Sequence, residues 1–142
     1  MGRYDDLLYQ LIKNNMRNCF KRPPDKELEA QIKRYPGIPC DYMDFLKEIG
    51  YGDIGDGYLI IYSSLISPSD VYDSVKANKL RDIVFLGDDF SGNCIGFENF
   101  GVRELVEVDE NQKVSFLNIS FENFIKNKIA EYFNCFNEYR SG

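Results

Sequence analysis

The sequence contains no histidine among its 142 residues. This absence removes Ser-His-Asp and Cys-His nucleophile pairs, H-E-x-x-H zinc sites and acid–base catalysis by imidazole. Enzyme chemistry would therefore have to depend on carboxylates, lysine, tyrosine or a hard metal ion. A small chain of this composition suits protein binding better than turnover.

Cysteine is scarce and scattered. The four cysteines lie far apart with no C-x-x-C pair: Cys19, Cys40, Cys94 and Cys135. The paired spacing that is usual in a four-cysteine zinc site is absent, so we expect no metal there. Scattered cysteines of this kind indicate reduced, mostly buried thiols in a cytosol.

Long hydrophobic runs are also missing. No apolar stretch approaches 18 residues, and the chain does not open on a charged and then apolar leader. We therefore expect no membrane span and no secretory signal, and we expect a cytoplasmic protein.

Positive charge is outnumbered, with 17 Lys and Arg against 23 Asp and Glu, a net charge of −6. Nucleic-acid affinity depends largely on cationic side chains that neutralise phosphates, so we expect no nucleic-acid partner. The charge is compatible with a basic protein partner, because complementary charge speeds encounter. The alternative is that mild acidity only keeps the protein soluble.

One motif calls for a test. The segment GYGDIGDGY spells G-x-G-x-x-G at Gly50, Gly52 and Gly55. A phosphate-binding loop of this spacing leaves a strand and opens a helix. Here a helical stripe precedes the glycines and a strand pattern, YLIIY, follows them. Carbonyl groups at a helix end repel phosphate, so we expect a tight, exposed, acid-tipped loop and no bound nucleotide or other cofactor.

The hydrophobic periods predict an α+β fold. Helices are predicted over residues 3–17, 25–34 and 67–79. A further helix begins at the cap Asp41 and carries a buried stripe of Tyr42, Phe45, Leu46 and Ile49, and the last helix is capped by Ser120. Predicted strands cover residues 58–62, 82–86, 93–97, 102–108 and 113–117, with a turn at 87–92. The order predicts one domain over residues 1–142, with N-terminal helices, a mainly antiparallel sheet and a closing C-terminal helix.

The inward face of several predicted helices follows from the same period. In the first helix the apolar positions are Tyr4, Leu7, Leu8, Leu11 and Ile12, and in the second they are Leu28 and Ile32. The last helix carries a broad stripe that we interpret as core packing: Phe121, Phe124, Ile125, Ile129, Tyr132, Phe133 and Phe136.

The order of several short motifs resembles the SUKH superfamily, which includes fungal cell-wall glucan-synthesis regulators and many bacterial immunity proteins. The helix entry IPCDYMDFL at residues 38–46 is similar to its hydrophobic-Pro-x-x-Tyr-x-x-Phe-Leu pattern. The following Gly-x-Gly turn, the strand at Tyr58, VFLGDD with GN at 84–93, and SFENFI at 120–125 also resemble it. The resemblance covers residues 25–126.

The resemblance implies a single α+β domain without a catalytic centre. It implies an immunity protein that neutralises a cognate toxin, with a regulatory adaptor in cell-wall glucan synthesis as the alternative. Many delivered toxins are nucleases with a basic face, and an acidic inhibitor could cover that face.

We predict that the partner-binding residues are acidic and aromatic side chains in the turns. They are Tyr51, Asp53, Asp56, Tyr58, Asp88 and Asp89. A third hypothesis gives Asp88 and Asp89, joined by Asp53 or Asp56, an oxygen-ligand site for Mg²⁺ or Ca²⁺. Aspartate is common in turns for backbone hydrogen bonding, which is the simpler interpretation.

Overall fold

Seven strands follow one another in chain order across one antiparallel sheet. The computed structural model describes residues 2–141, and the side chains up to Cys135. The strands are β1 (Phe20–Lys21), β2 (Tyr51–Ile54), β3 (Leu59–Ile66), β4 (Ile83–Asp89), β5 (Cys94–Glu98), β6 (Leu105–Val108) and β7 (Val114–Phe116). The helices are α1 (Asp5–Lys13), α2 (Asp25–Arg34), α3 (Cys40–Glu48), α4 (Ser74–Lys79) and α5 (Phe121–Ser141), with short 3₁₀ turns η1 (Arg17–Cys19) and η2 (Pro68–Asp70). The predicted α+β class, with N-terminal helices and a closing C-terminal helix, is confirmed.

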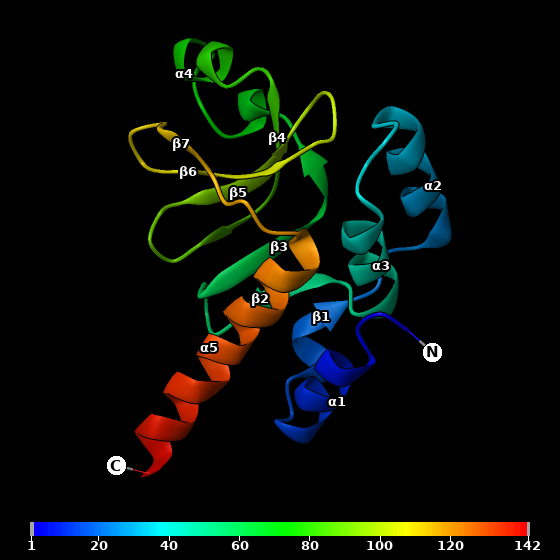
Figure 1. The fold of residues 1–142 in the computed structure, drawn as a ribbon, viewed down its shortest axis with the longest axis vertical. Helices are drawn as coiled ribbons and strands as arrows, with labels where there is room; N and C mark the ends of the chain where they lie inside the picture. The colour runs from blue at the N-terminus through cyan, green and yellow to red at the C-terminus, as the bar shows by residue number, and fades with distance from the viewer. Residues whose placement is uncertain (1, 142) are drawn as a thin grey trace.

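Two hydrophobic clusters cover the two faces of the sheet, because alternate residues of a strand point to opposite sides. The larger cluster joins residues of α1, α3 and α5 to one face. The smaller cluster contains Phe85, Cys94 and Val106 on the other face, with Tyr72 packed against it from the segment before α4. Figure 1 shows α5 and α1–α3 together, with α4 at the far end of the molecule beside β4, β6 and β7.

Aromatic rings fill the centre of the larger cluster. The ring of Phe45 lies 5.3 Å from Tyr4, 5.9 Å from Phe20 and 5.6 Å from Phe121, all in edge-to-face contact. Tyr42 contacts Phe121 in the same way. Edge-to-face pairs are favoured by the charge distribution of the rings. One helical stripe of α3 thus ties α1, β1 and α5 together.

Several element predictions are confirmed and others need correction. Helix α2 has the predicted bounds, the α3 stripe is fully buried, and Ser120 Oγ accepts a hydrogen bond from Asn123 N, as a cap does. Two apolar side chains that were predicted to face inward are exposed, Ile12 and Ile32. Phe136 of the predicted α5 stripe lies outside the described side chains.

The segment predicted as one helix over 67–79 is two short elements. Ser67 and Pro68 begin a turn as predicted, but that turn is the 3₁₀ segment η2, which closes on Asp70. Asp73 then caps α4, accepting a hydrogen bond from Lys76 N at 3.0 Å. A second cap, Asp73, lies six residues after Ser67 and begins a separate helix.

Asp41 caps a helix, but a different one from that predicted. It lies inside the first turn of α3, and its Oδ2 accepts a hydrogen bond from Glu122 N at the start of α5, at 3.0 Å. The hydroxyl of Tyr4 donates to the Asp41 carbonyl at 2.7 Å. The carboxylate thus satisfies one of the unpaired amides at the start of α5, 81 residues further along the chain.

An ion-pair network closes the same junction. Arg3 bonds to Asp44 at 3.0 Å and to Glu122 at 2.8 Å, and Lys126 bonds to Glu122 at 2.8 Å. The hydrogen bonds from Lys126 and Arg3 hold the pKa of Glu122 below its ordinary value. Glu122 therefore favours its charged form in the folded protein.

We expect Glu122→Gln to destabilise the protein by about 1 kcal/mol at neutral pH, the upper range for a surface ion pair. The folded pKa is lowered, so the contribution is present above the unfolded value of about 4.3 and is lost as the pH falls through the folded pKa. Urea unfolding at several pH values should show the two proteins converging in acid. The matched change Glu29→Gln, on an exposed side chain of α2, should have little effect at any pH. A pH-independent difference would contradict the prediction.

The cysteines are free, but the expectation of mostly buried thiols is wrong. Cys94 is buried, Cys19 is half-buried, and Cys40 and Cys135 are exposed. Cys40 is the first residue of α3.

Within the described range, no helix combines the length and the apolar composition needed to cross a bilayer.

Candidate functional site

The glycine motif forms a β-hairpin and not a loop between a strand and a helix. Gly50 has φ 113° and donates its N–H to the Phe45 carbonyl at the end of α3. Gly52 lies within β2, opposite Ile61 of β3. The predicted order of helix, glycines and strand is confirmed, but the glycine segment begins with a strand and only its second half is a turn. A helix end precedes the motif, so free amides at a helix start are not available here.

The turn between β2 and β3 is short, exposed and acidic. Gly55, Asp56 and Gly57 all have positive φ values, 70°, 50° and 98°. Asp53 Oδ1 accepts a hydrogen bond from Gly57 N at 2.7 Å, which closes the turn. Asp53 and Asp56 are both exposed. The predicted acidic tip is therefore present, and one of its carboxylates also builds the turn.

The turn between β4 and β5 is shorter than predicted, because β4 continues through Gly87, Asp88 and Asp89. Asp89 is buried, and its Oδ1 accepts hydrogen bonds from Ser91 N at 2.9 Å and Asn93 N at 3.2 Å. This aspartate holds the turn, which is the usual role of the residue there. Only Phe90, Ser91 and Gly92 are left at the exposed tip.

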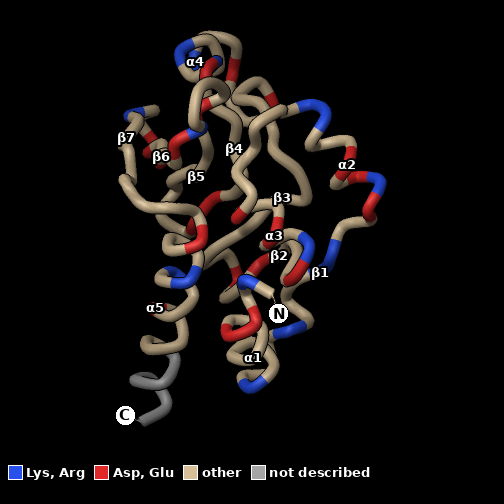
Figure 2. The backbone as a smooth tube through the Cα atoms, turned by 45° about the vertical axis from the view of Figure 1, so that its right-hand side comes forward, with Lys and Arg blue, Asp and Glu red and all other residues tan. Residues whose placement is uncertain are grey.

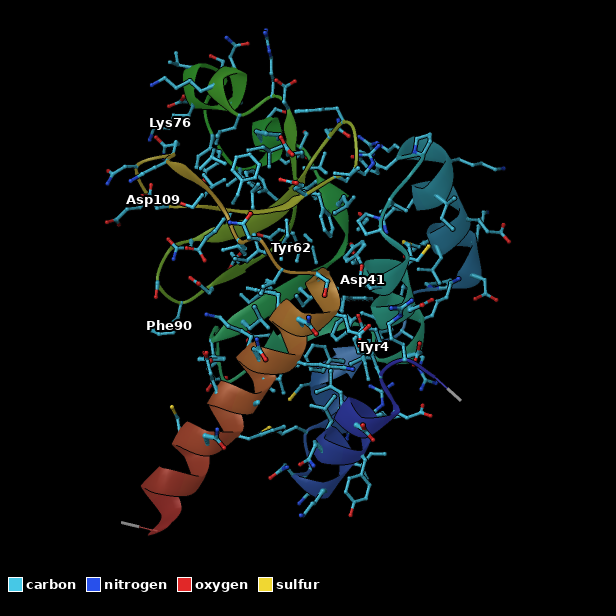
Figure 3. The ribbon with its side chains drawn as sticks, viewed as in Figure 1. Tyr4, Asp41, Tyr62, Lys76, Phe90 and Asp109 are labelled. Carbon is cyan, nitrogen blue, oxygen red and sulfur yellow. The ribbon has the colours of Figure 1, made fainter. Side chains whose placement is uncertain are left out.

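The two turns meet through aromatic rings. Tyr58 stacks on Phe90 with ring centroids 5.8 Å apart, and it lies 5.1 Å from Tyr132 of α5. The Tyr58 hydroxyl donates to the Lys128 carbonyl at 3.1 Å. Phe90 is 71% exposed, and Figure 3 shows its side chain projecting from the edge of the molecule. We call this group the hairpin-tip surface: Asp53, Asp56, Tyr58, Phe90 and Glu131.

Negative charge dominates the exposed part of the hairpin-tip surface. Lys128 Nζ lies 3.9 Å from Asp89 Oδ2 and 5.7 Å from the centre of the Tyr58 ring, so it offsets the buried carboxylate. Asp53, Asp56 and Glu131 are exposed and take part in no salt bridge among the described residues. Figure 2 shows the blue segments of α5 in its first turns.

The phenol of Tyr58 stays neutral at physiological pH. Partial burial raises its pKa to about 12, and the nearby Glu131 carboxylate adds to the shift. Tyr58 is half-buried and bonded to α5, so it supports Phe90 from behind. An exposed ring that is braced by a second ring is a suitable anchor for a partner, because little side-chain freedom is lost on binding.

Two predicted site residues lie elsewhere. Tyr51 is opposite Lys21 of β1, at the other end of β2 from the turn. Asp88 accepts a hydrogen bond from the Tyr62 hydroxyl, whereas its neighbour Asp89 contacts α5. Consecutive strand residues point to opposite faces, so Asp88 and Asp89 do not share a metal site. No group of three potential ligands that could hold a metal occurs within the described residues.

Phe90, Glu131 and Tyr132 were not predicted as site residues. Phe90 had a signal in the sequence, since it is a large apolar residue inside the turn-forming run Asp-Asp-Phe-Ser-Gly. An aromatic side chain in a short turn has little core to enter and tends to be exposed. Glu131 and Tyr132 join the site only through the packing of α5 on the turns.

The fold and this surface define a small α+β domain with an exposed acidic and aromatic face. Comparison of the chain with protein-family models, curated proteins and solved structures gives no match.

Proposed function

We propose that this chain is a non-catalytic protein-binding domain, an immunity protein that neutralises a cognate toxin by binding it directly in the cytoplasm. The observation that carries the proposal is the hairpin-tip surface, where an exposed phenylalanine is braced by tyrosine and bordered by three exposed carboxylates that form no salt bridge with described residues. This arrangement combines an apolar anchor with a charged rim, as protein interfaces do. The resemblance to SUKH proteins supports the same class.

The charge of the surface indicates the kind of partner. A net charge of −6 and a carboxylate rim attract a basic face and speed its encounter. A nuclease toxin has such a face, because it holds phosphates. Covering about 800 Å² of that face is enough for a specific complex and would exclude the nucleic acid.

The test uses the toxin domain encoded beside this chain, with affinity measured by calorimetry at low and high salt. Phe90→Ala should weaken binding by about 30-fold, since an anchor residue contributes about 2 kcal/mol. The double change of Asp53 and Asp56 to Asn should mainly slow association and flatten the salt dependence. The control is Phe100→Ala, which removes a 55% exposed ring at the other end of β5 and should leave affinity unchanged.

Two outcomes would count against the proposal. One is that no neighbouring effector domain binds at low salt. The other is that a deletion strain has altered wall composition but unchanged toxin sensitivity, which would favour the adaptor role in glucan synthesis.

A further inference from the structure

Strand β3 is longer than the strands that pair with it. Its pairing with β2 ends where Gly52 lies opposite Ile61. On the other side, its register with β4 jumps from Ile61 opposite Gly87 to Ile66 opposite Phe85. Residues 62–65 thus have no paired residue on either neighbouring strand within the described chain. An unpaired strand edge is a template for another extended segment.

Helix α2 lies beside this edge in place of a strand (Figure 1). The Leu65 N–H donates to the side-chain carbonyl of Gln31, so this main-chain group bonds to α2 and not to a strand. Gln31 is only 5% exposed and belongs to the face of α2 formed by residues 27, 30, 31 and 34, which have helical spacing. Between this face and β3 is a groove of about 290 Å³, lined by Glu27, Ala30, Gln31, Arg34, Tyr35, Ser63, Ser64 and Leu65.

The groove contains polar groups that no described residue uses. Arg34 stacks over the Tyr35 ring at 5.4 Å, but it forms no salt bridge within the described chain. Ser63 and Ser64 are exposed, and their hydroxyls make no hydrogen bond to described residues. A bidentate guanidinium that is already positioned by stacking is well suited to a carboxylate.

Buried polar groups behind the groove are also short of hydrogen bonds. The Gln31 side-chain N–H group reaches only the Met43 sulfur, at 3.7 Å. The Tyr42 hydroxyl behind it is fully buried and has no hydrogen-bond partner among the described residues. Tyr42 and Met43 do not line the groove, whereas Gln31 does, so the Gln31 N–H group is the buried polar group that a ligand there could contact.

We propose that the groove between α2 and β3 binds an extended peptide segment, which pairs with the edge of β3 at Ser63 and Ser64 and places a carboxylate against Arg34. The groove is bipolar, since Glu27 lies two helical turns from Arg34, about 10 Å along α2. A peptide is therefore oriented with its acidic side chain at the basic end of the helix, where Lys33 and Arg34 lie (Figure 2). The volume suits a few residues, and strand addition supplies the main-chain bonds.

This site is separate from the hairpin-tip surface. It lies at the opposite end of β3 from the turn that contains Asp56. The two sites also favour ligands of opposite charge. The partner proposed above is basic, whereas this groove takes an acidic segment. The two proposals can therefore fail independently.

The probe is a phage library of random seven-residue peptides selected against the full chain. Enriched sequences should carry Asp or Glu, and a fluorescein-labelled synthetic copy should bind with an affinity that falls at least tenfold in Arg34→Gln. The control variant Lys33→Gln removes the same charge from the next residue of α2, which does not line the groove, and should bind within twofold of the parent. Phe90→Ala should also leave peptide binding unchanged.

Two further readouts test strand addition itself. Amide resonances of residues 63–65 should shift when the peptide is added. Replacing one backbone N–H of the peptide by N-methyl should lower the affinity at least tenfold at the positions whose N–H faces β3. The proposal is overturned if no peptide is enriched, if Lys33→Gln weakens binding as much as Arg34→Gln, or if N-methylation at every position leaves the affinity unchanged.

Discussion

Replacing Phe45 by alanine is expected to lower the free energy of unfolding by about 3–5 kcal/mol, the usual range for a buried phenylalanine. The side chain is fully buried and contacts Tyr4, Phe20 and Phe121 edge to face. These contacts come from the N-cap of α1, from β1 and from α5, so the cavity would loosen the packing of three elements on α3. A domain of this size has about 5–15 kcal/mol of stability, so the loss would be a large fraction.

Urea unfolding followed by circular dichroism measures this effect, since the slope and midpoint give the free energy. Phe45→Leu keeps most of the volume and should cost less than the alanine change. The control is Phe116→Ala, because that ring is 49% exposed on β7 and its loss should change stability by about 0.5 kcal/mol or less. A loss below 1 kcal/mol for Phe45→Ala would show that the aromatic cluster does not hold the layers together.

The part of the fold that could be predicted depends on local signals. Helix α2 begins after Pro23-Pro24 and ends before Pro36-Gly37, so the chain itself marks its bounds. The α3 stripe was predicted because its apolar period of 3.6 is uninterrupted, and such a stripe must be buried. Both signals lie within a dozen residues of the feature that they define.

The parts that could not be predicted depend on distant partners. Strand β1 has only two residues, and it is a strand because Phe20 pairs with Gly52. The sequence predicts Asp41 as a cap for its own helix. Nothing near Asp41 in the chain indicates that its carboxylate would accept a hydrogen bond from Glu122 N. Ile32 fits the helical period of α2, but the buried position on that face is taken by Gln31, which bonds to β3.

The candidate surface shows the same division. The acidic turn at Asp53 and Asp56 followed from glycine and aspartate, which favour turns for local reasons. The stacking of Tyr58 on Phe90 follows from strand register, since Leu59 lies opposite Asp89 and so brings the two turns to one end of the sheet. Register is fixed by the whole buried face and is not encoded in either turn.

Register also explains the glycines of the G-x-G-x-x-G segment. A Cβ atom on Gly52 would lie 1.9 Å from the Cys19 carbonyl oxygen, and one on Gly50 would lie 2.3 Å from the Lys21 carbonyl oxygen. Both contacts are with backbone that cannot rotate away. These two glycines therefore let the segment of η1 and β1 pass close beside β2, and no nucleotide is needed to account for them.

Gly52→Ala is accordingly expected to lower stability by about 3 kcal/mol, at the upper end for inserting a methyl group into a packed site. Relief of the clash requires the Cys19 carbonyl to move, which breaks the pairing of Phe20 with Gly52 and withdraws the Phe20 ring from Phe45. Gly57→Ala is the matched control, since a Cβ there meets nothing within 4 Å and only its φ of 98° is strained. That change should cost about 1 kcal/mol.

The comparison separates two reasons for having glycine in one nine-residue segment. If close approach of β1 is the constraint at position 52, urea unfolding will show the larger loss for Gly52→Ala, and Phe20→Ala will remove much of the difference because the β1 contact is already weakened. Equal losses at positions 52 and 57 would mean that the close approach of β1 at position 52 costs no more than the backbone strain at position 57. In that case the packing of β1 against β2 would not be what fixes the start of the sheet.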